Sequence, residues 1–254
     1  MKLKSISFLL ALLLTLPVIA QDKAQVIAHR GYWKCEGSAQ NSIRSLERAE
    51  EIKVYGSEFD VHLTSDNVPV IFHDDKVNNL VIQETPYSTL KDIKLANGES
   101  IPTLREYLEA AKHTRHIKLI FELKAHATPE RNREAARISV DLIREKKLQD
   151  RTEYISFNLD ATKEFVRLEP KAAVYYLNGE LSPKEVKALG ITGIDYSVKV
   201  MQQQPQWFKE AKELGLKVNV WTVNDPAVAK EMIKQGADFI TTDIPEEIQQ
   251  LIKP

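Results

Sequence analysis

The sequence has almost no cysteine, no excess of charge of one sign and no repeated or low-complexity segment. Cys35 is the single cysteine among 254 residues, which excludes an internal disulfide. Lysine and arginine number 35 against 36 acidic residues, a formal net charge of −1. That balance provides neither a global basic field for nucleic acid nor a polybasic membrane patch, so we expect no nucleic-acid partner.

The one long apolar run lies at the N-terminus. Two lysines precede the almost wholly apolar residues 6–16, and small side chains follow before the sequence turns polar. This pattern predicts a secretory signal peptide over residues 1–20, cleaved near Ala20, with an uncleaved anchor as the alternative. The run is short for a membrane span. We therefore expect residues 21–254 to form one exported domain, periplasmic or secreted, with no stable membrane span.

Short apolar segments rich in β-branched and aromatic residues alternate with helical segments along this domain. Thr103 and Ser182 each begin a capping box, and Thr128 and Asp225 each precede a proline at a helix start. Such alternation predicts a parallel sheet with right-handed crossovers. The nine candidate strands are residues 26–29, 54–60, 68–72, 118–123, 153–157, 173–177, 192–195, 217–223 and 238–241.

Nine strands are one too many for an eight-stranded barrel, and the extra one follows the second strand closely. The link from Thr64 to Val68 is too short for a parallel crossover, so residues 61–64 and 68–72 are predicted to form a hairpin. The other eight strands are predicted to close a single-domain (β/α)8 TIM barrel, an α/β fold. An open doubly wound sheet is the alternative. Residues 74–100 are expected to be an irregular lid or rim insertion.

Acids, bases and cations gather where the predicted strands end. Glu58 and Asp60 are one residue apart on a strand and so point to the same side, while Phe59 points away. In a TIM barrel the carboxyl ends of all strands meet at one face, which carries the chemistry. The alternative to a catalytic site is a structural role, as rim histidines and strand-end ion pairs. The other strand-end residues are His29, Arg30, His73, Glu122, Lys124 and Trp221.

These residue types favour phosphodiester cleavage. The three carboxylates, Glu58, Asp60 and Glu122, suit Ca²⁺ or Mg²⁺, and the set lacks the His- and Cys-rich donors that zinc prefers. Arginine and lysine side chains match phosphate oxygens. Two histidines supply one proton acceptor and one proton donor near neutral pH. A metal and cations would stabilise the charge that develops on the phosphoryl group.

The sequence resembles the glycerophosphodiester phosphodiesterase family, within the phospholipase-C-like phosphodiesterase TIM barrels, over nearly all of the mature chain. No single tripeptide is specific, but the set in this order is. The matching motifs are His29-Arg30-Gly31, Asn41-Ser42, Glu58-x-Asp60-Val61-x-Leu63-Thr64-x-Asp66, His73-Asp74, Ile101-Pro102-Thr103-Leu104, Glu122-Leu123-Lys124, Trp221-Thr222-Val223-Asn224 and Ile240-Thr241-Thr242-Asp243-x-Pro245.

The resemblance implies hydrolysis of deacylated phospholipids such as glycerophosphocholine to glycerol 3-phosphate and an alcohol. It implies that Glu58, Asp60 and Glu122 bind a divalent metal, Ca²⁺ or Mg²⁺. In the family, the neighbouring glycerol hydroxyl is thought to attack and form a cyclic phosphate, which water then opens. The resemblance also implies that His29 and His73 are the general acid and base, and that Arg30 and Lys124 contact the phosphate.

Two residues depart from the family pattern, and neither belongs to the proposed catalytic set. Gln40 replaces the usual glutamate at the first helix entry and removes a charge, so substrate or metal preference is expected to differ. Asn67 replaces the usual turn glycine and also tolerates a left-handed turn. Trp33 and Trp221 are a candidate wall for a choline-like group, with ordinary rim packing as the alternative.

Other functions remain alternatives. A lysophospholipase D, or a hydrolase of glycerophosphoinositol or glycerol-phosphate polymers, would use the same barrel. An inactive surface or binding barrel is a further alternative, although all of the proposed catalytic residues are present. A barrel that enolises its substrate beside Mg²⁺ would not explain the His29-Arg30 pair as well. The sequence does not indicate the oligomeric state.

Overall fold

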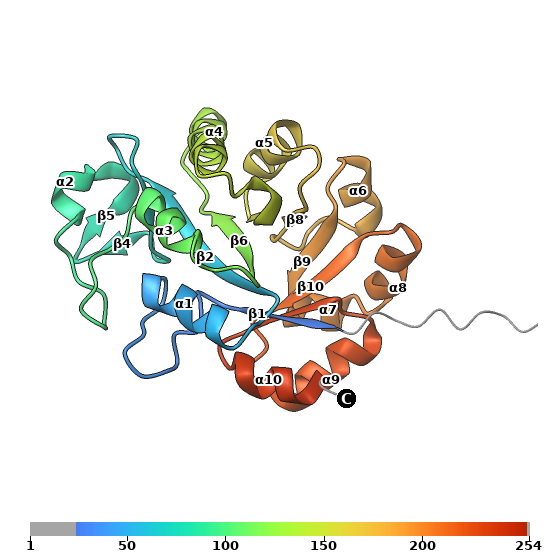
Figure 1. The fold of residues 1–254 in the computed structure, drawn as a ribbon. Helices are drawn as coiled ribbons and strands as arrows, with labels where there is room; N and C mark the ends of the chain where they lie inside the picture. The colour runs from blue at the N-terminus through green and yellow to red at the C-terminus, as the bar shows by residue number, and fades with distance from the viewer. Residues whose placement is uncertain (1–23, 253–254) are drawn as a thin grey trace, which may run out of the picture.

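Eight parallel strands close into a barrel in the computed structural model, which describes residues 24–252 (Figure 1). The predicted leader, residues 1–20, lies outside the described residues. β1 pairs in parallel with both β2 and β11, which closes the sheet and excludes the open-sheet alternative. The barrel strands are β1 (Gln25–Ala28), β2 (Gly56–Leu63), β6 (Lys118–Leu123), β7 (Thr152–Ser156), β8 (Val174–Tyr176), β9 (Gly193–Ser197), β10 (Lys217–Trp221) and β11 (Phe239–Thr242).

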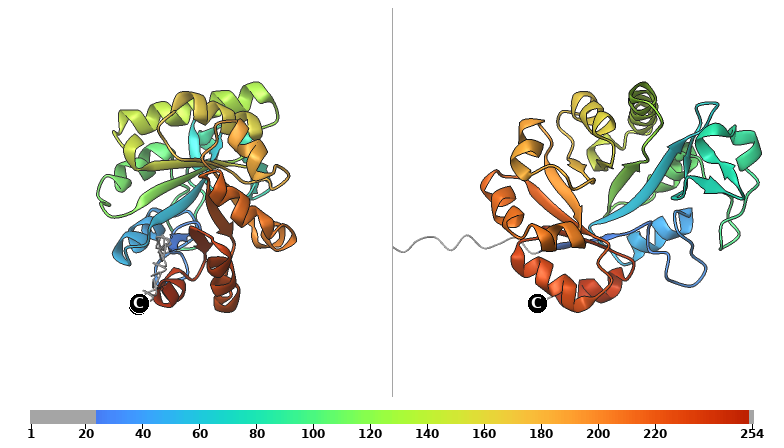
Figure 2. Two further views of the ribbon diagram at one scale, coloured as in Figure 1. Left: turned by 90° about the vertical axis from the view of Figure 1, so that its right-hand side faces the viewer. Right: turned by 180° about the vertical axis from the view of Figure 1, so that it is seen from behind.

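Helices cover the outside of the barrel, as the three ribbon views show (Figures 1 and 2). The predicted capping boxes at Thr103 and Ser182 are both present, and the side chains of Thr128 and Asp225 accept hydrogen bonds from the first turns of their helices. The helices around the barrel are α1 (Ile43–Glu51), α3 (Leu104–Ala111), α4 (Pro129–Glu145), α5 (Leu159–Leu168), α6 (Pro183–Ala188), α7 (Val198–Gln203), α8 (Gln206–Glu213), α9 (Pro226–Gln235) and α10 (Pro245–Ile252), and a short 3₁₀ turn, η2 (Gln149–Arg151), precedes β7.

The predicted hairpin is confirmed. β3 (Pro69–Ile71) pairs antiparallel with the end of β2, with Val61 opposite Ile71. The expectation of an irregular insertion over residues 74–100 was wrong, because it holds short elements of its own beyond β3 (Figure 1). They are β4 (Lys76–Val77), β5 (Leu80–Val81), η1 (Ile82–Glu84) and α2 (Tyr87–Leu90).

These insertion elements pack on a small apolar cluster separate from the barrel core. Val70, Ile82, Leu90 and Ile101 are its buried members. Each element spans two to four residues, too short for a hydrophobic periodicity to show in the sequence. The insertion is therefore a folded rim segment seated on the hairpin.

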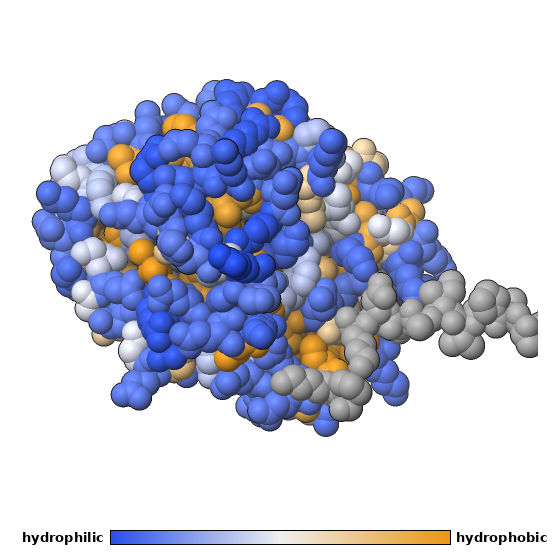
Figure 3. All heavy atoms as spheres, in the orientation of Figure 1, coloured by the Kyte–Doolittle hydropathy of each residue, from blue (hydrophilic) through white to orange (hydrophobic). Residues whose placement is uncertain are grey.

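Two apolar regions stabilise the barrel itself. A large core lies between the strands and the helices, and a smaller cluster that includes Ile27, Ile120, Tyr175 and Phe239 fills the barrel interior. Figure 3 shows a mainly hydrophilic face with apolar atoms visible between polar ones. Over residues 24–252, no helix is long and apolar enough to cross a membrane.

Candidate active site

Strand alternation in β2 aims two carboxylates into the barrel. Phe59 points outward and packs on Tyr107 and Phe121, with ring centroids 4.5 and 5.7 Å away. Such aromatic pairs contribute about 0.5–1.5 kcal/mol each beyond burial. Glu58 and Asp60 therefore face inward, and a one-residue slip of the strand would bury both in the outer core.

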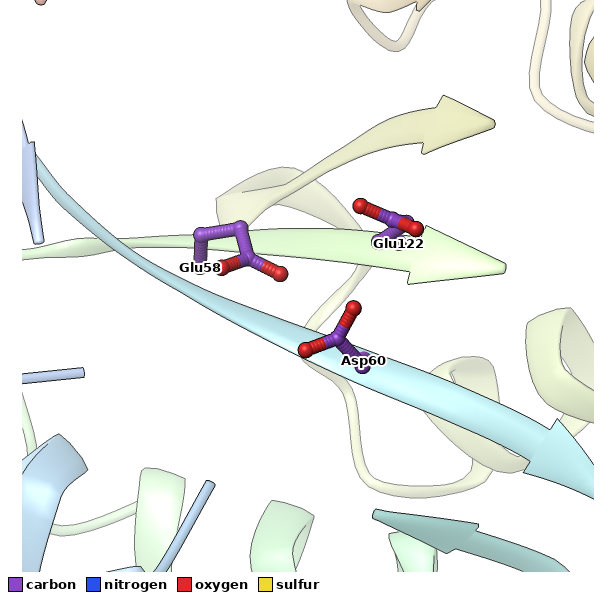
Figure 4. A group of neighbouring side chains, drawn as sticks. All are labelled: Glu58, Asp60 and Glu122. Carbon is purple, nitrogen blue, oxygen red and sulfur yellow. The ribbon is translucent and has the colours of Figure 1, made fainter. Parts of the chain in front are cut away.

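The third carboxylate comes from the neighbouring strand. In the parallel pairing of β2 with β6, Glu122 lies directly opposite Asp60. One oxygen from each of Glu58, Asp60 and Glu122 lies within 4.8 Å of the others, and all three residues are buried (Figure 4). The structure thus brings together the three residues predicted to be metal ligands.

Crowding of the three acids shifts their ionisation. Burial raises the pKa of Glu58 well above its usual range, and the charges of Asp60 and Glu122 add to the shift. Burial and Asp60 raise the pKa of Glu122 to about 7. Burial also acts on Asp60, but Lys124, His73 and a hydrogen bond from Asn41 outweigh it, and its pKa is lowered.

This donor set fits a hard divalent cation. Three carboxylates converge, and Oε1 of Glu58 is buried without a hydrogen-bond partner among the described residues. An unpartnered buried oxygen is costly unless a cation or water completes it. The residues that would hold such an ion are Glu58, Asp60 and Glu122.

Two cationic side chains flank the acids. Lys124 Nζ lies 2.9 Å from Glu122 Oε1 and 3.2 Å from Asp60 Oδ1, while Arg30 Nε lies 3.8 Å from Asp60 Oδ2. Burial alone would lower the pKa of Lys124, but Glu122 and Asp60 raise it above its ordinary value. Both predicted phosphate contacts therefore border the acid cluster, where their N–H groups can donate to phosphate oxygens.

The backbone turn after β1 places Arg30. Its φ of +55° is left-handed, and its N–H donates to Glu58 Oε2 at 2.7 Å. A left-handed residue other than glycine costs about 1–2 kcal/mol, and a hydrogen bond of this kind offsets about 0.5–1.5 kcal/mol of it. Gly31 follows with φ +74°, and a Cβ there would meet Ser45 Oγ at 2.2 Å, so only glycine fits the turn.

Each predicted catalytic histidine has a carboxylate partner. His29 Nδ1 lies 2.8 Å from Asp243 Oδ1, and His73 Nδ1 lies 2.6 Å from Asp74 Oδ1. If each Nδ1 donates to its carboxylate, the other ring nitrogen is free to move a proton at the substrate. Burial lowers the pKa of His73, although the charge of Asp60 opposes the shift.

All of the predicted site residues except Asp60 and Trp33 line one pocket at the carboxyl ends of the strands, with about 470 Å³ of empty space that is partly open to solvent. One side is charged, and the other is apolar. The charged side has His29, Arg30, Glu58, His73, Glu122 and Lys124, with Asp60 buried beside it, and the apolar side has Ile155, Phe157, Leu177 and Trp221.

The aromatic wall differs in part from the sequence prediction. Trp221 lines the pocket and meets Phe157 edge to face at 5.5 Å. Trp33 instead turns its indole N–H toward Asp243, the partner of His29, at 3.1 Å. The wall is thus built from Trp221 and Phe157, because the loop after β1 directs Trp33 to the rim.

Sequence reasoning missed two acids near the pocket. Asp243 belongs to the motif at residues 240–245, but the sequence did not predict a function for it, because it lies 214 residues from its partner His29. Asp195 lines the pocket from β9, and its Oδ1 is buried without a partner among residues 24–252. An acid inside an otherwise apolar strand was the available signal for Asp195.

Residues 29–247 match the Glycerophosphoryl diester phosphodiesterase family. A glycerophosphodiester phosphodiesterase of Caldanaerobacter subterraneus subsp. tengcongensis is 30% identical over 91% of this chain and 98% of its own. The crystal structure of a glycerophosphodiester phosphodiesterase from Parabacteroides distasonis has a TM-score of 0.90 and 62% identity, covering 91% of this chain and 98% of that one.

A third relative was solved with a ligand. An Oleispira antarctica phosphodiesterase, in complex with the product sn-glycerol-3-phosphate, has a TM-score of 0.76 and 30% identity over 91% of this chain and 97% of its own. The match to the family spans most of the chain and includes every residue of the pocket. The chain is therefore a phosphodiesterase and belongs to the glycerophosphoryl diester phosphodiesterase family, which confirms the predicted family and enzyme class.

Proposed function

We propose that this enzyme hydrolyses glycerophosphodiesters to glycerol 3-phosphate and an alcohol with Ca²⁺ or Mg²⁺ at Glu58, Asp60 and Glu122. The observation that carries the proposal is the convergence of this acid cluster, two cations and two histidines on one pocket. The Oleispira relative with bound sn-glycerol-3-phosphate supports the choice of substrate class.

The cations bind the phosphoryl oxygens in this scheme. Arg30 and Lys124 lie near different oxygens of Asp60, and both line the pocket, where their N–H groups can donate to phosphate oxygens. A bound divalent cation would add Lewis-acid stabilisation of the developing negative charge. Because the site is largely buried, these charges act at a lower dielectric than in water and stabilise the transition state more strongly.

The histidines move protons. One removes the proton from the attacking glycerol hydroxyl, whose oxygen bonds to phosphorus, and the other donates a proton to the alcohol oxygen as its bond to phosphorus breaks. Water then attacks the phosphorus of the resulting cyclic phosphate and breaks one ring P–O bond, which leaves glycerol 3-phosphate. Asp243 holds His29 by Nδ1, and Asp74 holds His73 in the same way. In both cases the proton transfer is assigned to Nε2.

The apolar side supports a small alcohol group. Trp221 and Phe157 offer aromatic surface that suits a quaternary ammonium, as in choline. Glycerophosphocholine and glycerophosphoethanolamine therefore form an informative substrate pair, since only the first carries a quaternary trimethylammonium group.

Release of glycerol 3-phosphate from both substrates tests the reaction, in a coupled assay with and without EDTA. EDTA is expected to abolish turnover, and excess Ca²⁺ or Mg²⁺ to restore it; activity that is insensitive to the chelator would refute the metal assignment. His29→Ala and His73→Ala are each expected to lower kcat at least about a hundredfold. The exposed His113 provides the matched control, since His113→Ala should leave kcat unchanged. A His73→Ala enzyme of near-normal rate would contradict the proton-transfer scheme.

Export is a separate part of the proposal. The apolar segment after a basic start in residues 1–20 supports cleavage near Ala20 and delivery to the periplasm or the medium. N-terminal sequencing of the protein from a fractionated host tests it. Mature chains beginning near Gln21 outside the cytoplasm are expected, and a cytoplasmic chain that retains Met1 would contradict export.

A further inference from the structure

Gln83, in η1 of the insertion, contacts two segments beside the active site. Its amide Nε2 lies 3.0 Å from Nδ1 of His62 and 2.9 Å from the carbonyl oxygen of Ala125. His62 is fully buried on β2, two residues beyond Asp60, and Ala125 directly follows Lys124. Gln83 therefore joins the insertion to two segments that carry proposed site residues.

The partners of Gln83 fix the orientation of its amide. A backbone carbonyl only accepts hydrogen bonds, so the amide nitrogen, not its oxygen, must face Ala125. The same nitrogen then donates to His62, which means that His62 Nδ1 accepts and carries no proton. A neutral imidazole with a bare Nδ1 holds its proton on Nε2.

That proton points toward the chain segment of His73. His62 Nε2 lies 3.4 Å from the carbonyl oxygen of His73, a long contact in which an N–H is favourable and a bare nitrogen would repel. The neighbouring His126 accepts a hydrogen bond from the Leu63 N–H at Nε2, and its Nδ1 has no hydrogen-bond partner among the described residues, so it makes no bond to His62. The orientation of one amide in the insertion thus decides whether His62 attracts or repels the backbone at His73.

We propose that Gln83 and His62 are positioning residues that hold the backbone at His73 and the loop after Lys124 in fixed relation, so that the insertion sets their spacing. The inference rests on the proposed function through the roles of His73 and Lys124. Neither Gln83 nor His62 is required to touch the substrate. Small displacements of reacting groups are costly, since a shift of about 1 Å lowers rates by as much as about a hundredfold.

Two variants of Gln83 test this role. Gln83→Leu removes both donated bonds, and Gln83→Glu keeps the size but places an oxygen against the Ala125 carbonyl. Each is expected to lower kcat for glycerophosphocholine about tenfold. Gln235→Leu, which removes an amide that bonds to Glu231 on α9, is the matched control and should keep the wild-type kcat and KM.

Nitrogen-15 NMR of histidine-labelled protein reads the arrangement without any substrate. In the wild type at pH 7, His62 is expected to show a protonated Nε2 and a bare Nδ1, and in Gln83→Leu the Nδ1 resonance should move as its donor is lost. A protonated Nδ1 in the wild type would overturn the inference, as would a Gln83→Leu enzyme with unchanged kcat and KM. Wild-type protein that releases no glycerol 3-phosphate would overturn the proposed function instead, and the positioning role with it.

Discussion

Replacing Asp195 by asparagine is expected to make stability less dependent on pH. Asp195 lies inside the barrel on β9, and its Oδ1 has no hydrogen-bond partner within the described part of the chain. Burial raises its pKa to about 8; Asn219 opposes the shift, and Glu122 and Glu153 add to it. The folded protein therefore keeps a proton on this carboxyl at pH values where the unfolded chain has lost it.

The sign and size of the effect follow from that difference. An aspartate in the unfolded chain titrates near pH 3.9, so the free energy of unfolding falls as pH rises from about 4 to about 8. Each unit of pH in this range lowers the free energy of unfolding by about 1.36 kcal/mol, so the rise of about three units from pH 4 to pH 7 lowers it by about 4 kcal/mol. Asparagine has nearly the same shape and cannot ionise. Asp195→Asn is thus expected to exceed the wild type in stability at pH 7 by up to about 4 kcal/mol, and by about 1.5 kcal/mol at pH 5.

Urea unfolding at pH 5 and pH 7 measures this difference. EDTA is included because a bound cation near the pocket would favour the ionised carboxyl. Asp141→Asn, at a position three-quarters exposed, controls for the loss of one acidic charge and should show equal effects at both pH values. A stability difference for Asp195→Asn that is the same at pH 5 and pH 7 would refute the reasoning. An asparagine variant less stable than the wild type at pH 7 would refute it as well.

Two further substitutions test how the charged side of the pocket is tuned. Asp243→Asn removes the carboxylate that accepts from His29 Nδ1 and should lower kcat about ten- to a hundredfold. Burial raises the Asp243 pKa, but the His29 contact outweighs it and lowers the pKa to about 2, so the loss is expected at every pH above about 4. A pH–rate profile checks this, and an unchanged kcat would contradict it. Gln40→Glu places a carboxylate against Arg30 Nη1, now 2.7 Å from Gln40 Oε1, and should raise KM about fivefold by weakening the hold on phosphate. Gln40→Met is the neutral control, and a Gln40→Glu enzyme with unchanged KM would argue against a phosphate contact by Arg30.

Local sequence patterns were sufficient for the elements of the barrel. Caps such as Thr103 and Ser182 locate helix starts, because the residues that satisfy the first-turn N–H groups lie within four positions. The hairpin after β2 followed from the length of its link alone. The common side of Glu58 and Asp60 followed from strand alternation, a property of the backbone. The resemblance then supplied roles for the strand-end residues.

Contacts between distant segments were decided by the tertiary structure. Closure depends on the pairing of β1 with β2 and β11, and barrel register alone sets Glu122 beside Asp60. The insertion elements could not be predicted from the sequence, because a shared apolar cluster stabilises them and they are too short to show a hydrophobic periodicity.

The sequence by itself determined which chemical groups stand at the strand ends, since strand and cap signals are short-range and repeat along the chain. Only the fold decided which of them pair: Asp243 pairs with His29 across 214 residues, and Gln83 pairs with His62 through the insertion. The fold also places Asp195 in the pocket with its Oδ1 unpartnered among residues 24–252. Hydrogen bonds and desolvation act over a few ångströms in space, and separation along the chain carries no information about either.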